Sequence, residues 1–224
     1  MENIKKIIDG KKYSEKFLKQ VYPLSTNFYK KFNRKPCLAV ILVGDNTASG
    51  IYVKNKVYTA EKNGIKSVKV ILSNKVSEAN LLNEILKLNE DQNIDGILVQ
   101  LPLPVHISEK KIIHSINPMK DVDGFHPINF GKLFMGDPNF VPCTPLGCYY
   151  MLKNELKELS GKNAVIIGRS NIVGKPMASL LLASNCSVTI THSKTKNLRE
   201  HCKKADILIS AVGIPEMVDE TYVK

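Results

Sequence analysis

The chain has 224 residues, of which 43% are hydrophobic and 24% charged, so it has the composition of a globular protein and the length for one large or two small domains. No apolar run approaches the ~20 residues that a membrane helix needs, and the lysine-rich N-terminus contains no signal-peptide core. The net charge of +11 arises from 32 basic residues, but only three are arginine, the residue preferred for recognising phosphates and base edges. Because no basic run is interleaved with aromatic residues, we expect neither a nucleic acid nor a membrane as partner; a small polyanionic substrate would suit this surface.

The cysteines and histidines predict a cytoplasmic protein without a metal site. The five cysteines are odd in number and form no CxxC pair, so reduced thiols in a cytosol are expected rather than disulfides or a zinc site. The five histidines show neither an HExxH motif nor any other clustered ligand spacing.

Strands and helices alternate along the first part of the chain. Apolar positions over residues 12–33 predict a helix that Pro23 interrupts or kinks. The elements expected next are a strand at 37–43, a helix at 48–63, a strand at 68–72, a helix capped by Ser77 and running through Asn89, a strand at 94–100 and a helix at 108–116. The residues expected on the buried side of the helix capped by Ser77 are Leu81, Leu82, Ile85 and Leu86.

The second part of the chain begins with a stretch that lacks periodicity. Residues 117–142 are rich in Gly, Pro, Asp and Asn, so we expect a long functional loop that crosses between two lobes. Thr144 and Pro145 then predict a capped helix start, and Gly161 predicts its end. The elements expected beyond it are a strand at 164–167, a helix from 174, a strand at 187–190, a helix at 198–203 and a strand at 206–212.

This alternation predicts the fold class. Strands that alternate with helices argue for parallel sheets with crossover helices, so we expect an α/β protein of two lobes. An N-terminal α/β catalytic domain is expected at residues 1–142, and a Rossmann-like dinucleotide-binding domain at residues 143–224.

A strand–turn–helix motif at residues 163–182 organises the second lobe. Gly168 lets the chain turn tightly after the strand, and Gly174 lets the helix pack close against the sheet. The N–H groups and the positive dipole at the helix start would then face an anion such as a pyrophosphate. Arg169 and Ser170 lie in the turn, and the pattern is GxSxxVG rather than GxGxxG, so an ordinary strand–turn–helix without a ligand is the alternative.

The first lobe contains a candidate acid/base. Tyr52 and Lys56 are four residues apart, so on a helix they share one face. Val53 and Val57 beside them indicate that the helix is partly buried there, and burial would disfavour the charged form of a lysine, as acid/base chemistry requires. The alternative, which the spacing alone favours, is that the lysines of this helix form a solvated face.

Further polar candidates follow the next strand. Gln100 lies at the carboxyl end of a predicted strand, where ligands bind in open α/β sheets, although a polar strand-end residue would look the same. Asp121 and Asp123 lie in the irregular segment, where acidic residues are more often turn formers than ligands.

Five segments together resemble the bifunctional methylenetetrahydrofolate dehydrogenase/methenyltetrahydrofolate cyclohydrolase family. They are, in order, ASGIYVKNKVYTAEKNGI, DGILVQLPLP, KDVDGFHPINFGKL, PCTPLG and VIIGRSNIVGKPMASLLL. Each segment is modestly specific, but five in the same order make a chance match negligible. The likeness runs from Asp9 to about Pro215, which is nearly the whole chain.

The resemblance implies roles for single residues. It places the family's catalytic lysine at Lys56, which would act as general acid/base in the hydrolysis, and the family's glutamine at Gln100, which would hold and tune that lysine. It places the partner tyrosine at Tyr52, for stacking on or orienting the substrate, and the pterin-binding aspartate at Asp123, counted with the catalytic residues. The remaining substrate-binding residues that it implies are Val99, Leu101 and Asp121.

The implied reaction is the NADP-dependent oxidation of 5,10-methylenetetrahydrofolate to 5,10-methenyltetrahydrofolate, followed by hydrolysis to 10-formyltetrahydrofolate. NADP is expected rather than NAD, because the strand that ends near Ile190 is followed by no Asp or Glu that could bind the ribose hydroxyls. Arg169, Ser193 and nearby lysines would suit a 2′-phosphate instead. The expected cofactor-binding residues are Gly168, Arg169, Ser170, Gly174 and Ser193.

The resemblance also bears on partners and on chain length. It implies a folate substrate, including polyglutamylated forms, and a homodimer. Members of the family continue with a further strand, a PVPGGVGP-like loop and a last helix, which this sequence does not contain. An inactive truncated fragment that binds folate or nucleotide is therefore the alternative function, although the presence of Tyr52, Lys56, Gln100 and Asp123 argues against it.

Overall fold

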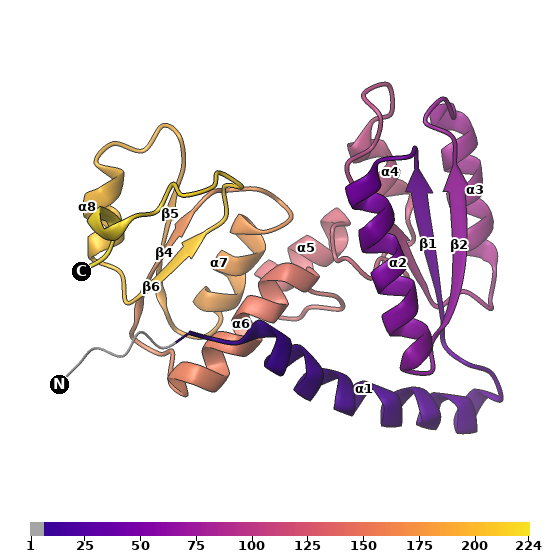
Figure 1. Cartoon of the computed structure of the whole chain (residues 1–224), viewed down its shortest axis with the longest axis horizontal. Helices are drawn as coiled ribbons and strands as arrows, with labels where there is room; N and C mark the ends of the chain where they lie inside the picture. Colours follow the sequence, from indigo (N-terminus) through magenta and orange to yellow (C-terminus); the bar gives the residue numbers. More distant parts are fainter. Residues whose placement is uncertain (1–6) are drawn as a thin grey trace. The chain divides into compact units, whose positions relative to one another are not determined.

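A computed structural model describes residues 7–224, which divide into two α/β units (Figure 1). The N-terminal unit comprises residues 9–122, and the C-terminal unit comprises residues 123–224 together with Ile7 and Ile8. Each unit contains its own three-stranded parallel sheet, with the first strand of the unit in the middle. The predicted α/β class with two parallel sheets is confirmed.

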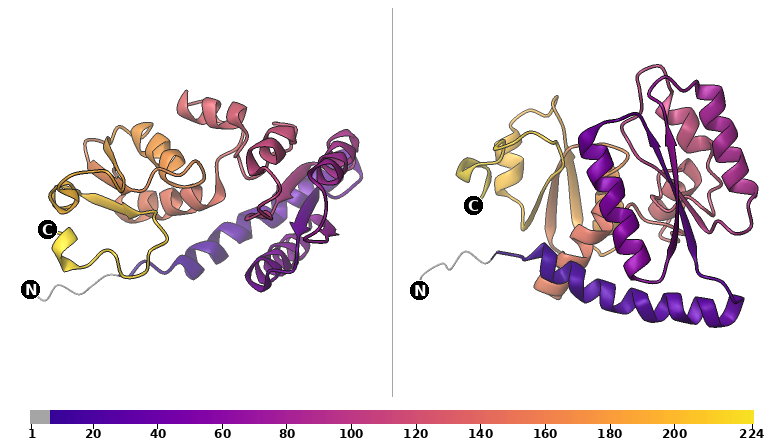
Figure 2. Two further views of the ribbon diagram at one scale, coloured as in Figure 1. Left: turned by 90° about the horizontal axis from the view of Figure 1, so that it is seen from above. Right: turned by 45° about the vertical axis from the view of Figure 1, so that its right-hand side comes forward.

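The N-terminal unit is a three-layer sandwich. Its elements are α1 (Gly10–Phe32), β1 (Cys37–Val43), α2 (Thr47–Lys62), β2 (Lys66–Leu72), α3 (Glu78–Glu90), β3 (Gly96–Val99) and α4 (Glu109–Ser115). Its sheet has the order β2-β1-β3, and β1 pairs in parallel with both neighbours. Ala39 and Ile41 of β1 pack with α3 and α4 on one face, whereas Val40 and Leu42 pack with α2 on the other. The right-hand view of Figure 2 shows α2 and α3 on opposite sides of this sheet.

Two features of the N-terminal unit differ from the sequence predictions. Of the two outcomes predicted for Pro23, the interruption is wrong, because α1 continues through the proline to Phe32. Near the proline, the Ser25 hydroxyl donates to the carbonyl oxygens of Tyr22 (2.9 Å) and Asn63 (2.7 Å), which ties α1 to the end of α2. Leu86 was expected in the core but is 53% exposed, because α3 buries the stripe formed by Leu81, Ile85 and Leu88 instead.

The C-terminal unit repeats the same sheet order with different helices. Its elements are α5 (Pro127–Phe134), α6 (Cys143–Leu156), β4 (Asn163–Ile167), α7 (Gly174–Leu182), β5 (Ser187–Thr191), α8 (Leu198–Lys203), β6 (Ile207–Ser210) and the 3-10 turn η1 (Glu220–Tyr222). The sheet order is β5-β4-β6, again all parallel. Ala164 and Ile166 of β4 pack with α6 and α7, and Val165 and Ile167 pack with α8 and η1.

The segment expected to be one long loop contains a helix. Pro127 is the first residue of α5, because a proline fits the first helical position, and the His126 ring accepts a hydrogen bond from the Ile128 amide. The next helix also differs from the prediction: α6 begins at Cys143 with no side-chain cap and ends at Leu156, well before Gly161. Lys157, the residue that caps the end of α6, has a positive φ of 59°.

The boundary between the units lies earlier than residues 142 and 143. The contacts divide the chain between Val122 and Asp123, so residues 123–142, with α5, belong to the C-terminal unit. The other elements lie within a few residues of their predicted bounds, and α8 coincides with its prediction. Among the described residues, no helix is both long and apolar enough to cross a membrane.

Candidate active site

The carboxyl edge of the sheet in the N-terminal unit brings the first candidate residues together. Because β1 and β3 are parallel neighbours, the residues that follow them lie at the same edge. Gln100 directly follows β3, and its backbone N–H donates to the Ile41 carbonyl of β1 at 2.9 Å. The segment that follows β1 leads into α2, which contains Tyr52 and Lys56. The fold therefore places α2 beside the end of β3.

Lys56 and Gln100 form a direct contact. The Lys56 Nζ donates to the Gln100 Oε1 at 3.1 Å, across 44 residues of sequence. The Gln100 Nε2 donates to the Leu101 carbonyl at 2.7 Å, which fixes the orientation of the amide with its oxygen towards the lysine. An amine held in this way can pass protons to and from a ligand at the strand edge.

The orientation of α2 follows from its buried valines. Val53 and Val57 are buried against Val40, Leu42 and Leu98 of the sheet, as the sequence predicted. The face that bears Tyr52 and Lys56 is consequently turned towards the solvent side: the tyrosine is 64% exposed and the lysine is half-buried. The Tyr52 ring is free to stack on a planar ligand, which is the role expected for it.

The remaining candidates near β3 differ in accessibility. Val99 is buried in the core, whereas Leu101 is half-buried and uses its carbonyl to hold Gln100. Asp121 is only 1% exposed and forms a parallel bridge with Ile97 in the middle of β3. Asp121 is therefore enclosed beside β3. Asp123 is half-buried and is the first residue of the C-terminal unit.

The turn after β4 requires both of its glycines. Gly168 has φ of +116°, and a Cβ there would collide with the Ala211 carbonyl oxygen. A Cβ at Gly174, the first residue of α7, would collide with the carbonyl group of Gly168. The two glycines therefore let the turn fold back on the start of α7, as the sequence predicted for a dinucleotide turn.

Ser170 changes the expectation for the start of α7. Its Oγ accepts hydrogen bonds from the backbone N–H groups of Val173 (3.1 Å) and Gly174 (3.2 Å). Its carbonyl oxygen accepts a hydrogen bond from the Lys175 N–H (3.0 Å). The amides expected to face a pyrophosphate are thus already bound within the turn. A serine hydroxyl has one further hydrogen to donate, so Ser170 itself can present a donor to a phosphate oxygen.

Arg169 and Ser193 lie at the same edge of this sheet. The Gly168 amide donates to the Thr191 carbonyl at 2.9 Å, so the turns after β4 and β5 are neighbours. Both side chains are exposed, and within residues 7–224 neither makes a hydrogen bond or an ion pair. The turn that holds Ser193 is closed by the Thr195 hydroxyl, which accepts the His192 amide at 2.9 Å. Cationic and hydroxyl donors in this position fit a phosphorylated ligand.

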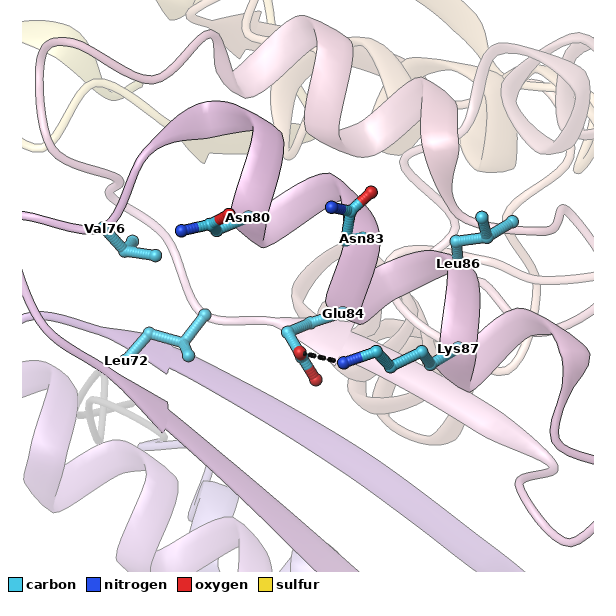
Figure 3. Close-up of a pocket in the computed structure, with 7 residues that line it drawn as sticks. All are labelled: Leu72, Val76, Asn80, Asn83, Glu84, Leu86 and Lys87. Atoms are coloured by element: carbon cyan, nitrogen blue, oxygen red, sulfur yellow. Dashed lines mark hydrogen bonds and ion pairs between the residues drawn. The ribbon is translucent and has the colours of Figure 1, made fainter.

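One hollow in the N-terminal unit does not coincide with the candidate residues. It has a volume of about 510 Å³ and lies beside α3 and the end of β2 (Figure 3). The residues that line it are Leu72, Val76, Asn80, Asn83, Glu84, Leu86 and Lys87. Glu84 and Lys87, which are neighbours on α3, form an ion pair at its wall, with 2.6 Å between the charged atoms. In the described part of the chain, no group of three or more His, Cys, Asp or Glu side chains could hold a metal ion.

The fold and the site define a class of protein: a two-domain α/β protein with a lysine–glutamine pair at one sheet edge and a glycine-framed dinucleotide turn at the other. Family models identify it further. A model of the tetrahydrofolate dehydrogenase/cyclohydrolase catalytic domain matches residues 8–123, and a model of the NAD(P)-binding domain of the same enzymes matches residues 142–224. The chain belongs to the tetrahydrofolate dehydrogenase/cyclohydrolase family.

Individual relatives agree with this membership. The bifunctional protein FolD of Pelagibacter ubique is 52% identical over 218 residues, which are 97% of this chain and 78% of that protein. A crystal structure of FolD, a methylenetetrahydrofolate dehydrogenase/cyclohydrolase from Campylobacter jejuni, is 46% identical with a TM-score of 0.94, over 98% of this chain and 78% of that one. The Trypanosoma brucei enzyme, complexed with NADP cofactor and inhibitor, is 32% identical with a TM-score of 0.93, over 98% and 75% of the two chains.

Sequence reasoning missed three contributors to these sites. The Leu101 carbonyl orients Gln100, Thr195 closes the turn at Ser193, and Lys120 anchors the segment that leads to Asp121. A backbone carbonyl carries no signal in the sequence. The threonine three residues after His192 and the lysine of the KDVDG segment were visible, but nothing local showed which groups they would contact.

Proposed function

We propose that this chain is a bifunctional one-carbon folate enzyme. It oxidises 5,10-methylenetetrahydrofolate to 5,10-methenyltetrahydrofolate with NADP, and then hydrolyses the product to 10-formyltetrahydrofolate. The observation that carries the proposal is the contact between Lys56 and Gln100, formed within the stretch that matches the family's catalytic domain. The alternative of an inactive fragment is not favoured, because both family domains match and the lysine–glutamine pair is in place.

Lys56 serves the hydrolysis as general acid/base. Water adds to the electrophilic methenyl carbon and loses two protons as its oxygen becomes the formyl oxygen. One proton goes to the N5 ring nitrogen as its bond to that carbon breaks, and one is released. The Lys56 amine, held by Gln100, relays these protons, and general acid–base catalysis of this kind contributes roughly 10²–10⁴-fold.

The remaining residues of the N-terminal half position the folate. The exposed Tyr52 ring stacks on or orients the substrate, and Asp123 hydrogen-bonds the pterin. Leu101 and the backbone near Val99 line the strand edge beside Gln100. Asp121 contributes through the placement of its own segment, since its side chain is enclosed.

The cofactor half fits NADP better than NAD. Gly168 and Gly174 allow the tight turn before α7, and Ser170, Arg169 and Ser193 offer donors at this turn and the neighbouring one, without a carboxylate. When bound, NADP supplies the acceptor for the hydride that leaves the methylene carbon. Arg169 and Ser193 bind the 2′-phosphate, which selects NADP, and the Ser170 hydroxyl donates to a phosphate oxygen.

A second copy of this chain is the proposed protein partner. In the sheet order β5-β4-β6, β5 lies at an edge, where its outer backbone groups can pair with another strand. Beside it, an apolar hollow of about 380 Å³ is formed by α5, α7 and β5, and Phe134 at its rim is 64% exposed. Pairing of two β5 edges would cover both features. Ile190→Lys, which places a charge on β5 in this hollow, is expected to convert a dimer to a monomer in sedimentation experiments, and an unaltered dimer would refute this arrangement.

The five free cysteines suit a cytoplasmic location.

The lysine-rich surface suits the polyglutamate tail of cellular folates. Binding of this tail is tested by comparing the KM values of monoglutamate and pentaglutamate substrates at low and high salt. A lower KM for the pentaglutamate that disappears at high salt is expected, and equal values at low salt would argue against a tail site.

The proposed function is tested by NADPH formation. Purified chain is given 5,10-methylenetetrahydrofolate with NADP, with NAD in parallel, and the decay of added 5,10-methenyltetrahydrofolate is followed separately. Turnover in both assays with NADP preferred is the expected result. Absence of both activities, with binding of neither folate nor NADP, would overturn the proposal.

A further inference from the structure

The ammonium group of Lys120 closes the carboxyl end of α3. Its Nζ donates to the carbonyl oxygens of Leu88 (3.0 Å), Asn89 (2.8 Å) and Asp91 (2.8 Å), which lie at the last residues of the helix and its cap. Carbonyls at a helix end have no partner within the helix, and a cation there also interacts favourably with the helix dipole. One side chain thus satisfies three backbone acceptors about thirty residues away in sequence.

The backbone of the same residue is bound to β3. The Ile97 N–H donates to the Lys120 carbonyl at 2.7 Å, and Asp121 forms the parallel bridge with Ile97. Val122 then packs on Gly96 so closely that a Cβ at the glycine would collide with the Val122 Cγ1. Residues 120–122 are therefore held between the end of α3, through a side chain, and β3, through the backbone.

This segment leads directly to the aspartate assigned to the pterin. β3 ends at Val99 and is followed by Gln100, and Asp121 is bridged in parallel to Ile97 of the same strand. The docking of Lys120 therefore helps to set the path of the chain up to Val122, the residue before Asp123. We propose that Lys120 is a positioning residue for the folate site, which acts by fixing residues 121 and 122 alongside β3. The proposal rests on the proposed function, since it assigns the folate to that edge.

A second anchor lets this role be separated from folding. The Asn89 side chain donates to the Ser115 carbonyl at 2.7 Å and accepts the Asn117 amide at 2.8 Å, so the earlier part of the loop is tied to α3 without Lys120. Removal of the Lys120 ammonium should therefore weaken the docking of residues 120–122 while α3, α4 and the sheet stay folded.

The variants are Lys120→Met, which keeps the length of the side chain without the charge, and Lys120→Arg, which restores a cation. Lys110→Met, at an exposed position of α4, is the matched control. The dehydrogenase kcat, the KM for 5,10-methylenetetrahydrofolate and the KM for NADP are measured for each. Hydrogen exchange of the Ile97 amide is followed in the same proteins, because that amide binds the Lys120 carbonyl.

Lys120→Met is expected to raise the KM for the folate roughly tenfold, as expected for the loss of hydrogen bonds to a charged group, with the KM for NADP unchanged. The Ile97 amide should exchange faster while the amides of β1 keep their protection. Lys120→Arg should recover most of both properties, and Lys110→Met should resemble the wild type.

Two results would overturn the proposal. One is a variant with a lowered melting temperature and an unchanged KM for the folate, which would make Lys120 a structural cap only. The other is unchanged exchange of the Ile97 amide in Lys120→Met, which would show that the segment docks without the ammonium. The second readout needs no turnover, so it stays decisive if the wild-type chain lacks activity and the proposed function itself fails.

Discussion

The carboxyl edges of the two sheets share one topology but differ in how their polar groups are held. Both sheets place the first strand of their unit in the middle, in the orders β2-β1-β3 and β5-β4-β6. At the first edge, Lys56, Gln100 and the Leu101 carbonyl form a connected chain of hydrogen bonds. At the second edge, Arg169 and Ser193 are exposed and bind no other side chain within the described residues.

The difference follows from the tasks assigned to the two edges. A group that moves protons must have a fixed position before the substrate arrives, because its contribution depends on geometry in the transition state. A group that recognises a phosphate can remain hydrated until the ligand replaces the water, since its contribution is charge and hydrogen bonding. The backbone frames the second edge through Gly168 and Gly174, while its recognition groups stay open.

The strongest test of the connected edge is Lys56→Met, for which we expect a loss of roughly 10²–10⁴-fold in cyclohydrolase turnover with the fold retained. The side chain keeps its apolar stem but can no longer relay a proton. The rate of methenyl hydrolysis and the circular dichroism spectrum are compared with those of Lys54→Met, an exposed lysine on the same helix. Full hydrolysis by the Lys56 variant would remove the acid/base assignment.

A smaller loss is expected from Gln100→Met. Without the amide, the lysine loses the acceptor that holds it at 3.1 Å, but the amine itself remains. We expect hydrolysis to fall about tenfold, which corresponds to one hydrogen bond to a charged group. Measured turnover should lie between those of the wild type and Lys56→Met. A loss as large as that of Lys56→Met would instead give Gln100 a direct part in the chemistry.

The tight turn at the carboxyl edge of the second sheet is tested by Gly174→Ala. The added Cβ meets the Gly168 carbonyl group, which is backbone and cannot rotate away, so a destabilisation of about 1–3 kcal/mol is expected from overpacking. Gly147→Ala in α6 is the control, because a Cβ there meets nothing within 4 Å and should be neutral or stabilising. Chemical denaturation of both variants checks the contrast, and equal stability of the two would contradict it.

The exposed side chains at the carboxyl edge of the second sheet are tested by Arg169→Met. We expect the KM for NADP to rise roughly tenfold while the KM for NAD and the stability stay unchanged, because within residues 7–224 the guanidinium makes no hydrogen bond or ion pair that could be lost. Lys204→Met, exposed and away from the turn, serves as control. If both cofactors weakened equally, Arg169 would bind a part that they share, and the 2′-phosphate assignment would be wrong.

The smallest expected effect concerns an ion pair at the opposite edge of the sheet in the N-terminal unit. Arg34 donates to both Asp95 oxygens at 2.7 and 2.8 Å, and the Cys37 amide donates to the same carboxylate at 2.8 Å. Burial would raise the pKa of Asp95, but the hydrogen bonds from Arg34 and Cys37 outweigh it and hold that pKa below its usual value. The Arg34–Asp95 pair joins β1 to β3 at their amino ends, whereas the candidate residues follow the carboxyl ends of these strands. A hydrogen-bonded network of polar side chains therefore does not by itself mark an active site.

The sign of its pH dependence follows from this lowered pKa. The stabilisation from Asp95 is present above the unfolded-state pKa of about 4 and is lost as the pH falls through the lower folded value. Acid unfolding of the wild type should therefore be steeper than that of Asp95→Asn, with little difference in slope at neutral pH. If the stability of both proteins fell in the same way at acid pH, the Arg34–Asp95 pair would contribute no pH-dependent stability.

Elements with local signals were well predicted. The strands at β1 and β4 are continuous apolar runs, and the Ser77 cap and the extent of α8 can be read from a few neighbouring residues. The helix α5 was missed because its eight residues sit in a segment crowded with glycine and proline, where short helices have little periodicity. An interruption of α1 at Pro23 was predicted from the local rule that proline breaks a helix, whereas α1 continues through the proline.

The sequence by itself determined the alternation of strands and helices, the family, and the residues Lys56, Gln100 and Gly168 as candidates, because periodicity and motifs are properties of neighbours along the chain. Only the tertiary structure decided what these residues contact. The lysine and the glutamine are 44 positions apart, and the Lys120 ammonium meets carbonyls 29 to 32 positions away. Likewise, the enclosure of Asp121 depends on its place beside β3. Hydrogen bonds act over about 3 Å, so their partners are set by how the sheet and helices bring distant segments together.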